Sequence, residues 1–286
     1  MKILAAYNIK GGVGKTATAV NLAYLSARAG FRTLIWDLDP QGATTFYFRI
    51  KPKMRGAGRA LIRGKRHPDS LIRETDYPGL DLLRAQFSYR HLDLTLADTR
   101  NPDKRLAKVL KLLEDEYERV YLDCAPGITL AAQSVFHAAD ALLVPTIPTT
   151  LSLRTLDQLL RYLKREGPGR IRVLPFYSML DARKSLQRRI CAATEGNARI
   201  LTTRIPYASV VEQMGERRAP VPAFAPASPA SRAFEALWQE VERRLGTEVS
   251  ADAVSAGGDA FRLRDTHRHR PPYEPEGEKN DSSPVR

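Results

Sequence analysis

The stretch that most constrains the fold is a glycine-rich loop between two apolar segments, close to the start of the chain. Residues 2–8 (KILAAYN) form a short apolar run, residues 10–16 read KGGVGKT, and residues 16–30 carry apolar side chains at helical spacing. In a strand, glycine turn and helix in this order, the first backbone amides of the helix are unpaired and point at one spot. The sequence therefore predicts a strand–loop–helix unit that binds a phosphate group.

Beyond this unit, apolar runs alternate with amphipathic segments along most of the chain. The runs are continuously apolar, which is typical of strands that are buried on both faces of a parallel sheet. The sequence therefore predicts an α/β fold with one mostly parallel, twisted sheet flanked by helices on both faces. We expect strands at residues 2–8, 32–39, 119–127, 139–148, 170–180 and 198–206, and helices at residues 16–30, 103–118, 151–167, 185–195 and 231–246.

The last forty residues differ in composition from the rest. They are poor in large apolar residues and rich in Pro, Gly, Ser and charge, which is typical of disorder. One element per roughly 20–30 residues leaves no room for a second core before them. We therefore expect one domain over residues 1–246 and a disordered tail over residues 247–286. The histidines of the tail, His267 and His269, are interpreted as solvated rather than metal-binding.

Charge favours a polyanionic partner. The chain holds 45 Lys and Arg against 32 Asp and Glu, a net charge of +13. The last forty residues hold six basic and eight acidic side chains, so the positive excess belongs to residues 1–246. A body this basic favours nucleic acid first and an anionic membrane surface second.

Signals for export or for crossing a membrane are missing from the sequence. No run of eighteen apolar residues is present. Cleavage of a signal peptide would destroy the glycine loop, so none is expected. The two cysteines, Cys124 and Cys191, lie too far apart for a disulfide framework or a metal motif. The sequence predicts a cytoplasmic protein.

The loop departs from the usual phosphate-binding pattern in two positions. In G-x-x-x-x-G-K-[ST], the lysine reaches the β- and γ-phosphates and the hydroxyl binds Mg²⁺, which assigns Lys15 and Thr16 here. The leading glycine is absent, because that position is Ile9, and a second lysine, Lys10, follows it. Gly11, Gly12 and Gly14 supply the room that the turn needs.

With its two lysines, KGGVGKT resembles the deviant Walker A loop of the ParA/MinD ATPases. The resemblance implies a homodimer that closes on ATP, with Lys10 of each subunit reaching the partner's nucleotide. A second cation would offset phosphate charge between two subunits and stabilise the transition state of hydrolysis. The resemblance also implies that the nucleotide is bound by Lys10, Gly11, Gly12, Val13, Gly14, Lys15, Thr16 and Ala17.

Two further motifs match the same family. The segment DLDPQG (37–42) implies that Asp39 positions the attacking water and that Asp37 lies beside Mg²⁺. The segment VYLDCAPG (120–127) resembles a Walker B strand, in which Asp123 holds the metal through water. Together the motifs imply an Mg²⁺-dependent ATP hydrolase with Lys10, Lys15 and Asp39 as catalytic residues. Selection of adenine is assigned to Asp181 and Pro206, from the segments FYSMLD and RIPYAS.

Three clusters of basic residues predict DNA binding without sequence preference, because contacts to phosphates read no bases. They lie at residues 49–66, 183–189 and 217–218, the last of which is Arg217 and Arg218. The resemblance then implies a nucleoid-associated ATPase that segregates or positions a cargo. Its expected partners are DNA and a ParB-like or cargo-adaptor activator. The alternative is a MinD-like ATPase on a membrane surface, but the tail lacks the apolar helix face that such binding needs.

Overall fold

The computed structural model describes residues 1–51 and 56–246, and two of the expectations above lie outside this range. These are the disordered tail with its histidines and two basic residues of the first cluster, Lys53 and Arg55. The strands are β1 (Lys2–Ala6), β2 (Thr33–Asp37), β3 (Ile72–Glu74), β4 (Leu80–Leu83), β5 (Arg119–Asp123), β6 (Ala141–Thr146), β7 (Arg172–Leu180) and β8 (Arg204–Pro206). The longer helices are α1 (Lys15–Arg28), α6 (Leu130–Ala138), α7 (Thr150–Glu166), α8 (Ser185–Ala193) and α12 (Pro229–Leu245).

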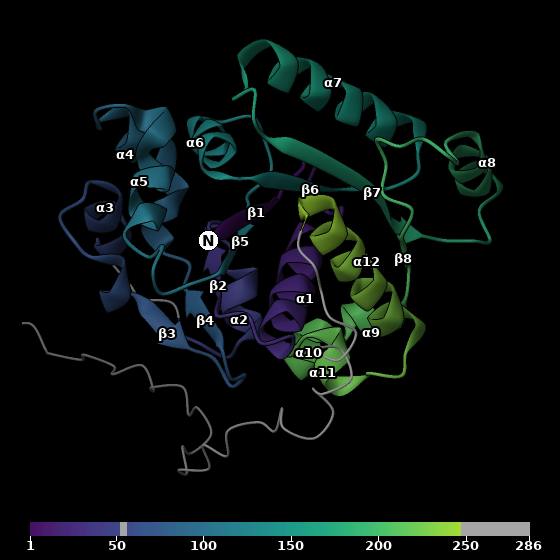
Figure 1. The fold of residues 1–286 in the computed structure, drawn as a ribbon, viewed down its shortest axis with the longest axis horizontal. Coiled ribbons are helices and arrows are strands. Elements are labelled where there is room, and N and C mark those ends of the chain that lie inside the picture. The colour runs from purple at the N-terminus through teal and green to yellow at the C-terminus, as the bar shows by residue number, and fades with distance from the viewer. Residues whose placement is uncertain (52–55, 247–286) are drawn as a thin grey trace, which may run out of the picture.

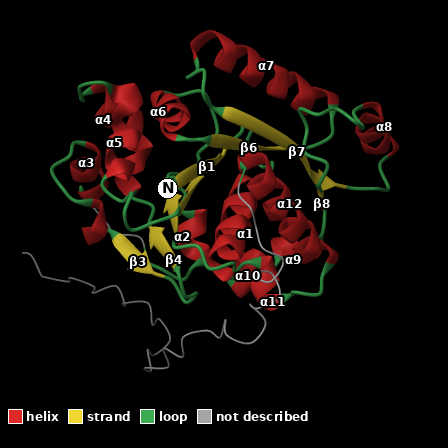
Figure 2. Ribbon diagram, in the orientation of Figure 1, coloured by secondary structure: helices red, strands yellow, loops and turns green. Residues whose placement is uncertain are grey.

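Shorter helices fill the connections between these elements (Figure 2). They are α2 (Ala43–Tyr47), α3 (Ala57–Ile62), α4 (Leu92–Ala97), α5 (Arg105–Lys111), α9 (Ser209–Glu212), α10 (Met214–Arg217) and α11 (Val221–Phe224). Three 3₁₀ turns add to them: η1 (Pro68–Ser70), η2 (Phe87–His91) and η3 (Pro102–Lys104).

All the strands of the described residues belong to one eight-stranded sheet with the order β3-β4-β2-β5-β1-β6-β7-β8. Neighbouring strands run parallel, except that β3 pairs with β4 in the antiparallel sense at one edge. The order places β1 between β5 and β6, and β5 between β1 and β2. The carboxyl ends of β1, β2 and β5 are therefore adjacent, and Asp123 pairs in register with both Ala6 and Asp37.

Helices cover both faces of the sheet (Figure 1), and alternate residues of the buried strands pack into two separate apolar layers. On one face Leu34 and Trp36 of β2 pack with side chains of α3 to α7. On the other, Leu4 of β1 and Ile35 of β2 pack with α1 and α12. The expected single α/β domain with a mostly parallel sheet and helices on both faces is confirmed. No helix of the described residues is both long enough and apolar enough to span a bilayer.

The strand expected at residues 198–206 is wrong over most of its length, because β8 comprises only Arg204–Pro206. The buried carboxylate of Glu240 on α12 accepts hydrogen bonds from the amides of Thr202 and Thr203, at 2.8 and 2.9 Å. The backbone amides of Thr202 and Thr203 are therefore bonded to a side chain of α12 and not to a neighbouring strand, and β8 begins only after them.

The helix expected at residues 103–118 is also shorter, since α5 ends at Lys111. The chain leaves it through the i to i+3 hydrogen bonds of a turn, from the amide of Leu112 to the carbonyl of Val109 and from that of Leu113 to that of Leu110. Leu113 is nevertheless fully buried, as the apolar pattern required.

Candidate nucleotide site

The glycine loop lies at the carboxyl end of β1, and α1 begins at its last lysine. Gly12 and Gly14 have positive φ angles of 68° and 95°. A Cβ atom on Gly14 would lie 2.9 Å from the hydroxyl oxygen of Ser178 on β7. Gly14 therefore combines a backbone conformation that favours glycine with a close approach to a neighbouring strand. The backbone amides at the start of α1 are left free to bind an anion.

The two lysines of the loop differ in exposure, although a hydrogen bond joins them. Lys15 is 7% exposed, and its Nζ donates to the backbone carbonyl of Lys10 at 3.1 Å. Burial lowers the pKa of Lys15 below its ordinary value. Lys10 is only half-buried, and Asn8 fixes its backbone by accepting a hydrogen bond from its amide at 2.9 Å. One lysine thus lies inside the site while the other is accessible from outside.

Two carboxylates lie fully buried beneath the loop. Asp123 accepts hydrogen bonds from the hydroxyl of Thr44 at 2.7 Å and from that of Thr16 at 3.3 Å. Asp37 accepts from both the amide and the hydroxyl of Thr45, at 2.8 and 2.7 Å. Burial raises the pKa of both carboxyls, and for Asp37 the negative charge of Asp123 adds to this rise. A bound cation would relieve both effects.

The donor atoms around Asp123 fit Mg²⁺. They are carboxylate and hydroxyl oxygens, which this ion prefers, and the ion usually keeps several waters and binds phosphate oxygens besides. The described part of the chain contains no group of three or more His, Cys, Asp or Glu residues that could hold a metal by itself. The protein can therefore supply only part of a coordination shell, through Thr16 and Asp123, and a nucleotide phosphate would complete it.

A cavity of about 400 Å³ opens above the loop. Asp39 lies on its wall, where its Oδ1 accepts a hydrogen bond from the amide of Gln41 at 2.9 Å. Asp37 and Asp123 do not line the cavity but lie below it. Other lining residues are Gly11, Gly12, Gly14, Lys15, Thr16, Ala17, Tyr47 and Pro126.

The cavity wall departs partly from expectation. Pro206 lines it, as expected, together with Ser178 and Met179 of β7. Asp181 is not among the lining residues, and its carboxylate is instead paired with Arg183, at 2.9 and 3.0 Å. Its role in selecting adenine stays a prediction that no contact to the cavity supports.

The side chains at the site that were not predicted include Tyr207, Glu212 and Thr44. The hydroxyl of Tyr207 donates to Glu212 at 2.9 Å at the mouth of the cavity, and Thr44 holds Asp123 from the side opposite Thr16. The signal for Thr44 was present, since a hydroxyl residue two positions after DPQG is placed to contact the neighbouring strand end.

Comparison with known proteins agrees with this geometry. Residues 1–166 match the family described as an AAA domain. The chain is 28% identical over 258 residues to the chromosome-partitioning ATPase Soj of Treponema pallidum, which covers 86% of this chain and 98% of that protein. It is 32% identical over 168 residues to the chromosome partitioning protein ParA of Caulobacter vibrioides, which covers 58% of this chain and 63% of that protein. The chain belongs to the ParA/Soj/MinD-like family of SIMIBI ATPases.

Solved structures share the fold of this ParA-like chain. The ATP complex of Cyanothece McdA aligns with a TM-score of 0.73 at 22% identity, over 87% of this chain and 97% of that one. Cobyrinic acid a,c-diamide synthase from Mycobacterium smegmatis, with bound ADP and magnesium, aligns with a TM-score of 0.72 at 24% identity, over 86% and 96%. At these identities the similarity establishes the fold alone.

The basic clusters of the ParA-like chain lie on three different sides of the domain (Figure 1). Residues 183–189 lie at α8, residues 217–218 at the end of α10, and the first cluster around α3. Near α3, Arg49 is paired with Asp76 and Arg63 with Asp98. A groove of about 550 Å³ between α3 and α5 is lined by the basic residues Arg63, Lys65, Arg66, His67, Arg105 and Lys108.

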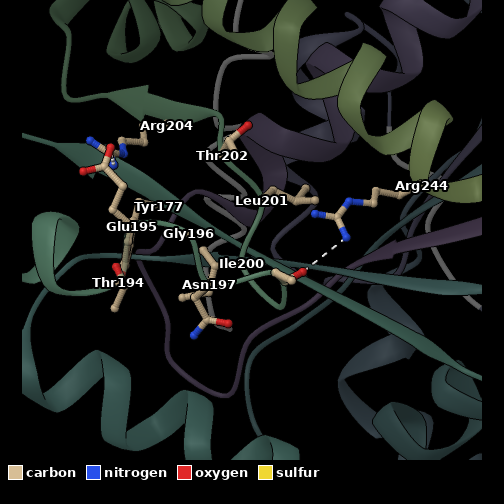
Figure 3. Close-up of a pocket in the computed structure, with 11 residues that line it drawn as sticks. Tyr177, Thr194, Glu195, Gly196, Asn197, Ile200, Leu201, Thr202, Arg204 and Arg244 are labelled. Carbon is tan, nitrogen blue, oxygen red and sulfur yellow. Dashed lines mark hydrogen bonds and ion pairs between the residues drawn. The ribbon is translucent and has the colours of Figure 1, made fainter.

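A second cavity, of about 410 Å³, lies beside β8 and away from the glycine loop (Figure 3). The turn after α8 forms one wall and Arg244 of α12 another. Arg244 donates to the carbonyl of Ala198 at 3.2 Å, and the hydroxyls of Tyr177 and Thr194 lie 2.9 Å apart. None of the site residues expected from the motifs lines this cavity.

Proposed function

We propose that this chain is an Mg²⁺-dependent ATPase that closes into a homodimer on ATP. The observation that carries the proposal is the pair of lysines on one fixed loop. Lys15 points inward to a carbonyl of the loop, and Lys10 remains accessible beside it. A nucleotide bound in one subunit would meet Lys15 of its own chain and Lys10 of the partner.

Each residue of the site has a physical role in this proposal. The amides of Gly14 to Thr16 and the ammonium of Lys15 bind the phosphates. Thr16 and Asp123 would hold Mg²⁺, which would offset charge on the phosphates, and Asp37 fixes the segment that carries Thr45. Asp39 lies on the cavity wall, where it can orient the attacking water.

The cellular role proposed for this ATPase is to segregate or position a cargo on the nucleoid, in the cytoplasm. The names of the relatives, which are partitioning proteins, and the basic surface support it. The ATP-bound dimer would bind DNA through phosphates, and a ParB-like or cargo-adaptor protein would stimulate hydrolysis. Residues 1–246 would form the ATPase domain, and the net acidic tail over 247–286 would be dispensable for DNA binding.

The test measures retention of two unrelated DNA duplexes by an ATP-bound Asp39→Ala dimer across a salt series. A protein that contacts about six phosphates loses roughly a thousandfold in affinity between ~50 and ~200 mM salt, because counterions are released. We expect this loss to be equal for both duplexes and to require ATP.

Charge reversal assigns the contacts to one side of the domain. The variants are Lys65→Glu with Lys108→Glu, Lys184→Glu with Arg189→Glu, and Arg217→Glu alone. If a pair contacts phosphates, its reversal should reduce the slope of log affinity for DNA against log salt concentration by about two.

The membrane alternative is tested with the same dimer, which is sedimented with vesicles of phosphatidylglycerol and phosphatidylethanolamine. Binding to vesicles without binding to DNA would refute the nucleoid role and favour the membrane-surface alternative.

A further inference from the structure

The short helix α2 connects the buried carboxylates to the protein surface. Its Thr44 donates a hydrogen bond to Asp123 and its Thr45 donates two to Asp37. A helix of five residues has little stability of its own, so contacts with the rest of the domain must set its position. Any group that holds α2 from the outside therefore also helps to orient both carboxylates.

Arg218 is such a group. Its guanidinium carbon lies 4.4 Å from the centre of the Phe46 ring, and its Nε donates to the backbone carbonyl of Phe46 at 3.1 Å. Phe46 lies in the last turn of α2, and its side chain is otherwise exposed to solvent. The guanidinium thus binds both the ring and the backbone of one residue, which a lysine ammonium cannot reproduce in the same geometry.

The segment that carries Arg218 is anchored to α1, the helix that follows the phosphate loop. Asn21 of α1 donates to the sulfur of Met214 at 3.3 Å and accepts from the amide of Val221 at 2.7 Å. Met214 is fully buried, and Arg218 ends α10 with a φ of 50°, an uncommon value for a residue other than glycine. Residues 214–221 therefore link α1 to α2, because α10 packs against α2 and α11 packs against α1.

We propose that Arg218 is a positioning residue that holds α2 against the nucleotide site, so that the Arg218–Phe46 contact sets the rate of ATP turnover. The proposal rests on the ATPase function proposed above and concerns the control of the same site. It also changes the expected role of Arg218, which the sequence assigned to DNA phosphates together with Arg217. Arg217 is exposed, whereas Arg218 is half-buried against α2.

The experiment measures kcat and KM for Mg²⁺-ATP in Arg218→Lys and Phe46→Leu, with Phe46→Tyr and Arg243→Lys as controls. Arg218→Lys keeps the positive charge and Phe46→Leu keeps an apolar side chain, but each removes the stacked contact. Arg218→Lys removes both the stacking and the hydrogen bond to the Phe46 carbonyl, together about 1–1.4 kcal/mol, so kcat should fall roughly five- to tenfold. Phe46→Leu removes the stacking alone, about 0.5–1 kcal/mol, so kcat should fall roughly two- to fivefold. KM should change by less than about twofold, because the phosphate loop is intact.

The controls separate positioning from general damage. Phe46→Tyr keeps the ring and should keep wild-type turnover. Arg243→Lys changes an exposed arginine of α12, outside the contact, and should have no effect. In the double variant Arg218→Lys with Phe46→Leu, kcat should be no lower than in the worse single variant, since both changes remove one interaction. Melting temperatures are measured for every variant to confirm folding.

Wild-type kcat in either Arg218→Lys or Phe46→Leu would overturn the proposal. So would loss of DNA retention in Arg218→Lys with unchanged kcat, because Arg218 would then be a phosphate contact alone. The proposal would also be overturned if the loss of kcat in the double variant equalled the product of the losses in the two single variants. Absence of turnover in the wild-type chain would refute the proposed ATPase function and this proposal together, an outcome distinct from wild-type turnover in the variants.

Discussion

The two cavities beside β7 are nearly equal in size, at about 400 and 410 Å³, but their polar groups are used differently. In the nucleotide cavity, an added Cβ on Gly11 or Gly12 would meet no atom within 4 Å, so the loop backbone faces open space. In the second cavity, arginines are engaged with the walls, as Arg244 is with the carbonyl of Ala198 and Arg204 with Glu195 at 3.9 Å (Figure 3).

We expect the arrangement of polar groups, rather than the volume, to distinguish the nucleotide cavity from the second cavity. The nucleotide cavity lies at the carboxyl ends of parallel strands and at the start of a long helix, where backbone donors point in one direction. The second cavity lies at the sheet edge, where side chains bind one another. We expect only the cavity above the glycine loop to bind a nucleotide.

The largest expected effect on ATP affinity is that of Lys15→Ala, compared with Arg244→Ala. Lys15 is the buried cation of the nucleotide cavity, and loss of one partner of a buried charge pair costs about 2–5 kcal/mol. ATP affinity, measured by isothermal titration calorimetry, should fall by about a hundredfold or more. Arg244→Ala removes a cation from the second cavity and should leave ATP affinity unchanged. Equal losses in both variants would show that the comparison is wrong.

Asp39→Ala should separate binding from chemistry. The carboxylate lies on the cavity wall and not beneath the loop, so its loss should leave ATP affinity within about threefold. Turnover should fall by about 10²–10⁴-fold, the range for loss of a group that assists proton transfer. The protein should then accumulate as an ATP-bound dimer, measured by light scattering after gel filtration. The matched control is Glu195→Ala in the second cavity, which should leave turnover unchanged. Unchanged turnover in Asp39→Ala itself would show that Asp39 has no role in hydrolysis.

Lys10→Ala should affect assembly rather than binding. The backbone of Lys10 is fixed by Asn8 and contacts Lys15, and alanine keeps both interactions. ATP affinity of the monomer should therefore change little, while dimerisation on ATP should be lost, as measured by analytical ultracentrifugation in the Asp39→Ala background. Normal dimerisation of the double variant would contradict a role for Lys10 across the interface.

The phosphate side of the site could be predicted because its signals are local in sequence. Gly14, Lys15 and Thr16 are consecutive, and Asp37 and Asp123 each end an apolar run. Parallel pairing of β2 with β5 then brings the two carboxylates together without further information. The mostly parallel sheet with helices on both faces followed from the same apolar runs, but its strands β3 and β4 were not predicted.

The rest could not be predicted because it depends on contacts between distant segments. Arg218 lies 172 positions from Phe46, and nothing in either segment indicates the partner. Arg105 joins the groove near α3 only because α5 packs beside that helix. The late start of the strand expected at 198–206 depends on Glu240, which lies 38 positions beyond Thr202.

The smallest expected effect compares one glycine from each cavity. Gly14 and Gly196 both have positive φ, at 95° and 77°, so alanine should strain either backbone by about 1–2 kcal/mol. For a domain of this size, each variant should lower the melting temperature by roughly 2–8 °C. A Cβ on Gly196 meets no atom within 4 Å, whereas on Gly14 it lies 2.9 Å from the Ser178 hydroxyl, so the Ser178 side chain or the loop must shift.

Only Gly14→Ala should therefore weaken ATP binding, by about tenfold, since a shift of roughly 1.4 kcal/mol in the loop is enough for that change. Calorimetric titration and thermal melting are run on both variants at the same protein concentration. Gly14 lies in the nucleotide loop and Gly196 in the second cavity, so their difference in ATP affinity measures the joint effect of backbone strain and of the close approach to Ser178 within the loop. Equal ATP affinity in the two variants, with equal losses of stability, would show that this approach is not needed for the shape of the nucleotide site.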